Sequence, residues 1–186
     1  MALRLFRTTG YSTLLMPGEA RLALHPAWMA FAISAWLALP ANVAVWRLAG
    51  GAGWQEWRQA AGSILALGGG SFALLSLLGW RRTFKLAATV LLLAGALAAC
   101  GLWVQELPLE TLWQQRPRAV LPGWASFMRW QVPAMMLLLA VVPVVWVWHV
   151  PVRRLPGPAQ LRANLAGTVA GAVVSAAGLL LLRQQP

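Results

Sequence analysis

The chain is organised as five long apolar runs separated by short polar or basic segments. The runs cover residues 28–48, 62–80, 86–104, 132–150 and 164–182. Each is long enough to cross a bilayer, because a transmembrane helix needs about 20 mainly apolar residues. Asp, Glu and Lys are absent from all of them, and only Arg47 and His149 intrude, each near the end of a run. The pattern predicts an all-α fold, a polytopic helical membrane domain with five transmembrane helices.

The segments outside the runs complete the expected domain organisation. Residues 1–27 form a predicted cytoplasmic tail, and residues 28–183 form the five-helix transmembrane domain. The longest connection, 105–131, combines apolar side chains with several tryptophans and arginines. Such a mixture favours an interfacial segment that lies on the periplasmic surface of the membrane.

Three features within the runs predict how the helices behave. Pro40 removes a backbone hydrogen bond, so we expect the first helix to bend there. Asn42 is expected to satisfy a freed carbonyl or to bond to a neighbouring helix, which makes it a polar helix-packing residue. The second run contains a stretch of small residues at 68–71, and the third contains another at 94–99. Because small residues permit close approach, these two runs are expected to pack as an antiparallel pair.

Composition supports a membrane protein and argues against a nucleic-acid partner. Hydrophobic residues make up 60% of the chain and charged residues only 10%, whereas a soluble domain carries about 25% charged residues. The net charge is +11. The basic residues lie between the apolar runs, however, and not on one accessible face as nucleic-acid binding requires. The expected surroundings are therefore the phospholipid bilayer.

The distribution of basic residues predicts the orientation. If the N-terminus is cytoplasmic, the cytoplasmic segments hold nine Arg and Lys residues and the opposite side holds six. The loop 80–85 is short and strongly basic, and short loops follow the positive-inside rule best. We therefore expect a cytoplasmic N-terminus and a C-terminus on the opposite, periplasmic side.

Candidate chemistry is sparse. The chain contains no Asp, four Glu, two His and the single cysteine Cys100. A hydrolytic metal site needs three or more converging ligands of these types. We therefore expect no metal site and no catalytic residue in this chain, and we expect Cys100 to act as a small packing residue.

The candidates for contact with a lipid head group lie in the segment 105–131. Glu106 and Glu110 are one helical turn apart, so their carboxylates would share a face that could attract an ammonium group. The alternative is that they form the solvated edge of an interfacial helix. Arg116 and Arg118 lie between tryptophans, as suits an anionic, lipid-rich surface.

Several segments repeat the order of a known membrane domain. His-Pro-Ala-Trp at 25–28 leads into the first run, which reads Ala-Trp-Leu-Ala-Leu-Pro-Ala-Asn-Val-Ala-Val-Trp-Arg over 35–47. The second run ends with Leu-Leu-Gly-Trp-Arg-Arg at 77–82. After the long outer segment, Val-Arg-Arg-Leu at 152–155 and Leu-Arg-Ala-Asn at 161–164 lead into the last run.

In this order and loop spacing, the chain resembles the N-terminal membrane domain of the bacterial lipid A phosphoethanolamine transferases. The resemblance implies five helices, an N-terminus inside the cell and a place in the bacterial inner membrane. It also implies a transfer of phosphoethanolamine from phosphatidylethanolamine to lipid A, through a threonine nucleophile beside zinc. Those residues belong to a large periplasmic domain that follows the fifth helix of the family, and this chain stops at Pro186. We therefore expect zinc only in such a separate catalytic domain, with no cofactor in this chain.

Three functions follow from these observations. The first is a membrane domain of a phosphoethanolamine transferase-like protein, which anchors and positions phosphatidylethanolamine or lipid A for a separate catalytic domain and does not catalyse transfer by itself. The second is a self-standing five-helix inner-membrane protein that binds or regulates an envelope partner. A small permease is a third. An open reading frame downstream, with the metal-ligand pattern of a sulfatase-like domain, would favour the first over the second.

Overall fold

A computed structural model of the chain describes residues 23–48, 53–80, 83–104, 123–153 and 155–183. Their helices, in chain order, are α3 (Pro26–Ala38), α4 (Val43–Leu48), α5 (Trp54–Leu77), α6 (Phe84–Val104), the 3-10 helix η2 (Trp124–Met128), α8 (Gln131–Met136), the π-helical turn η3 (Leu137–Val141), α9 (Val142–His149) and α10 (Gly157–Arg183). Within this part of the chain, the one β feature is an isolated bridge between Leu24 and Val152.

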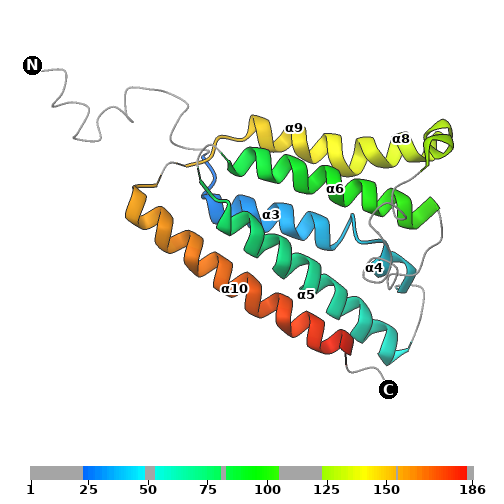
Figure 1. Ribbon diagram of the computed structural model, residues 1–186, viewed down its shortest axis with the longest axis horizontal. Coiled ribbons are helices and arrows are strands. Elements are labelled where there is room, and N and C mark those ends of the chain that lie inside the picture. Colours follow the sequence, from blue (N-terminus) through cyan, green and yellow to red (C-terminus); the bar gives the residue numbers. More distant parts are fainter. Residues whose placement is uncertain (1–22, 49–52, 81–82, 105–122, 154, 184–186) are drawn as a thin grey trace, which may run out of the picture.

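The helices confirm the predicted fold class. Four helical stretches are long and apolar enough to cross a membrane: α5, α6, the continuous stretch Gln131–His149, and α10. α3 is a shorter apolar helix, and the short α4 follows it after a break (Figure 1). The chain is thus an all-α, multi-pass membrane protein, in which α3 and α4 together take the place of the first predicted span.

The order of the helices in space differs from their order in the sequence. α3 lies in the middle of the molecule, with α5 on one side and α6 on the other (Figure 1). α10 packs along the far side of α5, and α8, η3 and α9 pack along the far side of α6. The C-terminal ends of α5 and α9 and the N-terminal ends of α3, α6 and α10 meet at one end of the bundle. We call it the basic end because Lys85 and Arg153 lie there.

The predicted close pairing of the second and third spans is wrong. α5 and α6 run antiparallel, as expected, but they touch only sparsely. A methyl group placed on Gly69 of α5 would meet the backbone of Ser175 and Gly171 in α10. One placed on Gly95 of α6 would lie 2.5 Å from Cδ2 of Leu37 in α3. Small residues permit close contact but do not choose the partner, and here α10 and α3 are the partners.

The interface between α5 and α10 is built from glycines that oppose each other in two layers. Cβ atoms at Gly69 and Gly171 would each lie 2.7 Å from the other residue's carbonyl oxygen. Gly62 and Gly178 repeat this relation one layer further along, with distances of 3.2 and 2.7 Å. Ser175 Oγ adds a hydrogen bond across the interface to the carbonyl of Ala66, at 3.0 Å. Close backbone contact of this kind drives helix association in lipid, where burial of apolar surface contributes little.

Pro40 breaks the first predicted helix instead of bending it. α3 ends at Ala38, and α4 begins at Val43. Proline has no N–H to donate, and its ring collides with the preceding turn of a helix. Asn42 then starts a new helix, because its Oδ1 accepts a hydrogen bond from the backbone N–H of Ala44 at 3.2 Å. The side chain thereby acts as an N-cap.

Pro143 interrupts the stretch Gln131–His149 in a different way. It has no N–H for the carbonyl four residues earlier, that of Leu139. The five residues Leu137–Val141 widen into a π-helical turn just before it. Trp36 of α3 reaches across and donates its indole N–H to the Leu139 carbonyl at 3.2 Å. A helix defect and its partner side chain therefore tie α3 to the second half of the bundle.

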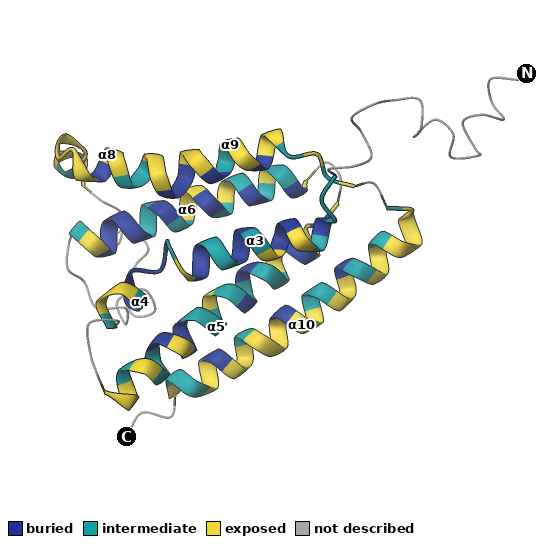
Figure 2. Cartoon of the chain, turned by 180° about the vertical axis from the view of Figure 1, so that it is seen from behind, coloured by how far each residue is buried: buried dark blue, intermediate teal, exposed yellow. Residues whose placement is uncertain are grey.

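The buried residues concentrate around α3 and α6 (Figure 2). Met29, Ile33, Leu92 and Val147 are at most 2% exposed and join α3, α6 and α9 in one core. α10 is the opposite case, since only 11% of its most apolar stretch is buried. Its outward side chains would therefore meet lipid in a membrane.

The tryptophans near the ends of the predicted spans stay outside the core. Seven tryptophans near these ends are between 39% and 78% exposed: Trp28, Trp46, Trp80, Trp103, Trp130, Trp146 and Trp148. An indole ring at the level of the lipid head groups combines an apolar body with a polar N–H. Their exposure fits an interfacial belt.

Candidate functional site

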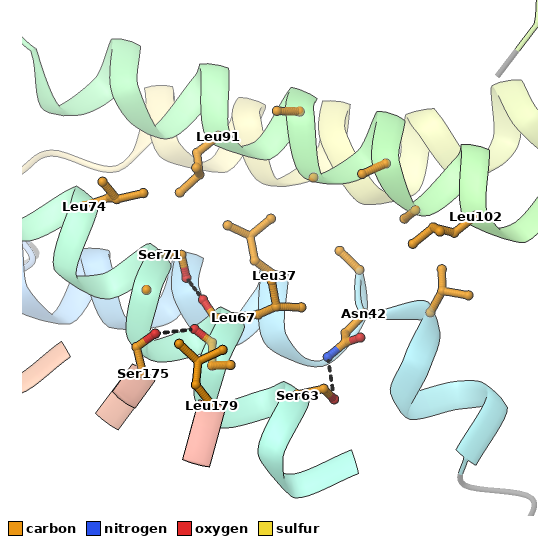
Figure 3. A pocket seen from close by; sticks show the side chains of 18 of the residues that line it. Leu37, Asn42, Ser63, Leu67, Ser71, Leu74, Leu91, Leu102, Ser175 and Leu179 are labelled. Carbon is orange, nitrogen blue, oxygen red and sulfur yellow. Dashed lines mark hydrogen bonds between the residues drawn. The ribbon is translucent and has the colours of Figure 1, made fainter. Parts of the chain in front are cut away.

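A cavity of about 400 Å³ lies between α5 and α6. Leu74 and Leu91 stand at its end nearer the middle of the bundle, and Asn42, Ser63 and Leu102 stand at the opposite end (Figure 3). Its walls come from α3, the α3–α4 break, α5, α6 and α10. Most of the lining side chains are aliphatic, so the interior is apolar.

The cavity exists because the small faces of α5 and α6 face each other with few contacts between them. Ala66 and Gly70 line it from α5, and Ala94 and Ala98 line it from α6. Leu37 of α3 projects between the two helices (Figure 3). α3 therefore acts as a spacer, and the small residues that were expected to bring the helices together instead leave space beside Leu37.

Asn42 and Ser63 lie at the end of the cavity farther from the basic end, which we call its outer end. Asn42 Nδ2 donates to Ser63 Oγ at 3.2 Å, and Ser63 Oγ donates to the carbonyl of Ala60 at 2.8 Å. Asn42 is 2% exposed and Ser63 is 4% exposed. These bonds join the α3–α4 break to α5, as expected for an Asn that bonds to a neighbouring helix.

Arg47 connects α4 to α6 at the same end of the cavity. Its Nη2 donates to the carbonyl of Leu102 at 2.6 Å. That carbonyl is in the last turn of α6, where backbone carbonyls have no partner inside the helix and attract a cation. The bond links α4 to α6, so both long walls of the cavity are held at their outer ends.

The other hydroxyl groups at the cavity are satisfied by backbone carbonyls. Ser71 Oγ donates to the carbonyl of Leu67 at 2.7 Å, and Ser175 Oγ donates to Ala66. Both hydroxyl groups therefore use their O–H donors within the helix bundle. Asn42 and Ser63 differ from them in being bonded to each other at one end of the cavity.

The sequence identified one residue of this site. Asn42 was expected to take part in helix packing, and its two hydrogen bonds confirm that role. The head-group candidates Glu106, Glu110, Arg116 and Arg118 lie outside the described residues. No group of three or more His, Cys, Asp or Glu side chains gathers among the residues that the structure describes.

Sequence reasoning missed the residues that shape the cavity. Leu37 is one apolar residue among many, and nothing in its own segment shows that it separates two other helices. Ser63 is one of several serines in the apolar runs, and its own segment does not show that it bonds to Asn42. Arg47 did carry a signal, because an arginine at the end of an apolar run needs a partner or access to water.

Comparison of the chain with known protein families, with curated proteins and with solved structures found no match. The fold itself therefore defines the class: a multi-pass helical membrane protein with an apolar cavity between two of its crossing helices.

Proposed function

We propose that this chain is a lipid-binding membrane domain that holds an acyl chain of a phospholipid in the cavity between α5 and α6. The observation that supports this is the cavity's lining, which is aliphatic along α5 and α6 and polar at one end. Its volume of about 400 Å³ lies within the range of about 300–1,000 Å³ of typical small-molecule sites. An acyl chain has the matching chemistry, since it offers methylene groups along its length and a polar head at one end.

The proposed orientation places the head group at the outer end of the bundle. Asn42 and Ser63 lie there, and Trp46 nearby is 60% exposed. The acyl chain would then extend toward Leu74 and Leu91. The resemblance to phosphoethanolamine transferases points to phosphatidylethanolamine as the lipid and to the outer leaflet of a bacterial inner membrane as its place. In this proposal the domain anchors and presents the lipid for a separate catalytic domain, and transfer chemistry is not carried out here.

The test is crosslinking with phosphatidylethanolamine that carries a photoreactive diazirine in one acyl chain. The wild-type protein should crosslink at cavity-lining residues, among them Leu67, Leu74 and Leu91. Ala94→Phe places a ring inside the cavity and should remove these crosslinks. Ala94 is exposed toward the cavity, so the ring has space without displacing the core.

The matched control is Ala172→Phe, the same change on the exposed face of α10. It should leave the pattern of crosslinks as in the wild type. Crosslinks spread evenly over the outward face of α10, or an Ala94→Phe protein with the wild-type pattern, would contradict the proposal.

The alternative is a self-standing protein that binds an envelope partner within the membrane. The outward face of α10 favours it, because Leu165, Val169 and Val173 are between 57% and 64% exposed along one side. A partner helix on this face would be captured by a photoreactive residue at Val169. A lipid in the cavity would be captured by one at Leu67 instead.

A further inference from the structure

A second cleft, of about 440 Å³, opens at the basic end of the bundle. It is separate from the acyl-chain cavity, whose lining residues it does not share. Its walls come from the start of α3, the end of α5, the start of α6, the segment after α9 and the start of α10, and they include Trp80, Lys85, Arg153 and Gly157.

Lys85 is fixed in this cleft by three interactions. Its Nζ donates to the carbonyls of Trp148 at 3.0 Å and Val150 at 3.3 Å, at the end of α9. The ammonium group also lies 5.8 Å from the centre of the Trp148 ring. An ammonium group has three N–H donors, so one remains after the two carbonyls. A charged donor is thus held in one place instead of sampling water freely.

Arg153 is placed by its backbone. The N–H of Arg153 donates to the carbonyl of Leu24 at 2.9 Å, and the N–H of Leu24 donates to the carbonyl of Pro151 at 3.0 Å. This bridge holds the segment after α9 against the start of α3. Arg153 lines the cleft and is exposed, so its guanidinium group can reach a ligand there.

A third donor lies behind the wall of the cleft. Asn164 is 9% exposed, and its Nδ2 has no hydrogen-bond partner among the described residues. Its Oδ1 accepts from Gln160 Nε2 at 2.8 Å, which orients the amide. Asn164 lines a space of about 10 Å³ that shares Pro26, Gly79 and Phe84 with the cleft. That space is about the size of one water molecule, which could relay the donor into the cleft.

The charged side chains that line the described part of the cleft are both positive, those of Lys85 and Arg153. No described Asp or Glu lines it. The acidic residue in the described part of the chain is Glu56, at the start of α5 and thus at the opposite end of the molecule. The N-terminal end of α10 also meets the cleft at Gly157, and a helix N-terminus favours negative charge. Trp80 at the cleft is 52% exposed, and exposed tryptophans are enriched at the level of the lipid head groups.

We propose that this cleft binds the phosphate of an anionic phospholipid in the leaflet at the basic end of the bundle. Two cations, a helix N-terminus and donors without acidic neighbours match an anionic head group, and basic pockets between transmembrane helices are known to bind such lipids. The lipid would hold the ends of α6, α9 and α10 together. The site does not depend on the acyl-chain cavity, so either proposal can fail alone.

The test measures binding of three probes to the purified full chain in detergent: dioctanoyl phosphatidylglycerol, dioctanoyl phosphatidylcholine and inorganic phosphate. Phosphatidylglycerol should bind more tightly than the other two. Arg153→Gln should weaken its binding about fivefold, the effect of about one surface charge on lipid attraction, and should leave phosphatidylcholine unchanged. Lys85→Gln should weaken it at least as much. Lys85→Gln also removes the hydrogen bonds that hold the end of α9, so it can lower binding by altering the fold. Arg153→Gln changes an exposed side chain and is therefore the more direct test of the site.

Arg162→Gln is the matched control. Arg162 lies near the same end of α10 and is exposed, but it does not line the cleft. It should change phosphatidylglycerol binding less than twofold. Equal losses for Arg162→Gln and Arg153→Gln, or equal affinity for phosphatidylglycerol and phosphatidylcholine, would overturn the site. Inorganic phosphate that binds as tightly as phosphatidylglycerol would show a site for a free anion and would overturn the assignment to a lipid.

Discussion

Single side chains form hydrogen bonds with backbone groups where helices of this protein are interrupted or end. Asn42 caps the helix that restarts after Pro40, and Arg47 bonds to a terminal carbonyl of α6. Trp36 donates to the carbonyl of Leu139, which lies within the π-helical turn. In a bilayer no water replaces a lost backbone partner, so each such bond prevents an unsatisfied group that would cost several kcal/mol in hydrocarbon.

The hydrogen bond from Trp36 to Leu139 should contribute to the stability of the protein. Trp36→Phe keeps the ring but removes the indole N–H, and it should lower the free energy of unfolding in detergent by about 1–3 kcal/mol. Pro143→Ala would return a backbone N–H to the same region. The effect of Trp36→Phe should therefore be smaller in a Pro143→Ala background.

Unfolding curves of the two single variants and the double variant measure this coupling. Trp146→Phe serves as the control, because it removes an indole N–H that has no such role in the helix defect. If Trp36→Phe lowers the free energy of unfolding by the same amount in the wild type and in Pro143→Ala, the indole and the proline are not linked as proposed.

At the scale of elements, the contact between α5 and α10 depends on glycine. A Cβ at Gly171 would lie 2.6 Å from the backbone nitrogen of Ala73. Backbone cannot rotate away, so the two helices would have to separate. A Cβ at Gly95 meets the end of the Leu37 side chain, which can change its rotamer.

Gly171→Ala should therefore destabilise the protein by about 1–3 kcal/mol, the usual cost of overpacking. Gly95→Ala should lower the free energy of unfolding by a smaller amount. Gly157→Ala is the control on the same helix, since nothing lies within 4 Å of a Cβ there, and its melting temperature should stay near that of the wild type. Equal melting of the Gly171 and Gly157 variants would show that α5 and α10 are not in close contact.

At the scale of the whole molecule, the ends of the helices predict the topology. Thr83 and Gly157 lie at the basic end, and Gly53 and Arg183 lie at the opposite end (Figure 1). In a Cys100→Ala protein, single cysteines at the first two positions should react with an impermeant maleimide only from the cytoplasm. Cysteines at the other two should react only from outside, because basic loops stay inside. Labelling of residues 83 and 157 from different sides would reject the arrangement.

The sequence alone determined the class of protein and the approximate positions of the membrane-spanning helices along the chain. The apolar runs are as long as a bilayer is thick, and that length is a local property that needs no knowledge of neighbours. Proline and asparagine positions are also local, so an interruption near Pro40 and a bonding role for Asn42 were predictable. The form of that interruption was not, because a bend and a break differ only in whether another helix and a new cap stabilise the open turn.

Tertiary structure alone decided which helices touch and where space remains. Glycines and alanines on α5, α6 and α10 look equivalent in the sequence, and each could serve any neighbour. The choice depends on α3, which inserts between α5 and α6 and directs the glycines of α5 toward α10. Leu37 and the cavity beside it follow from that insertion. The basic cleft likewise joins residues 26, 85 and 153, which only the packed ends of the helices bring together.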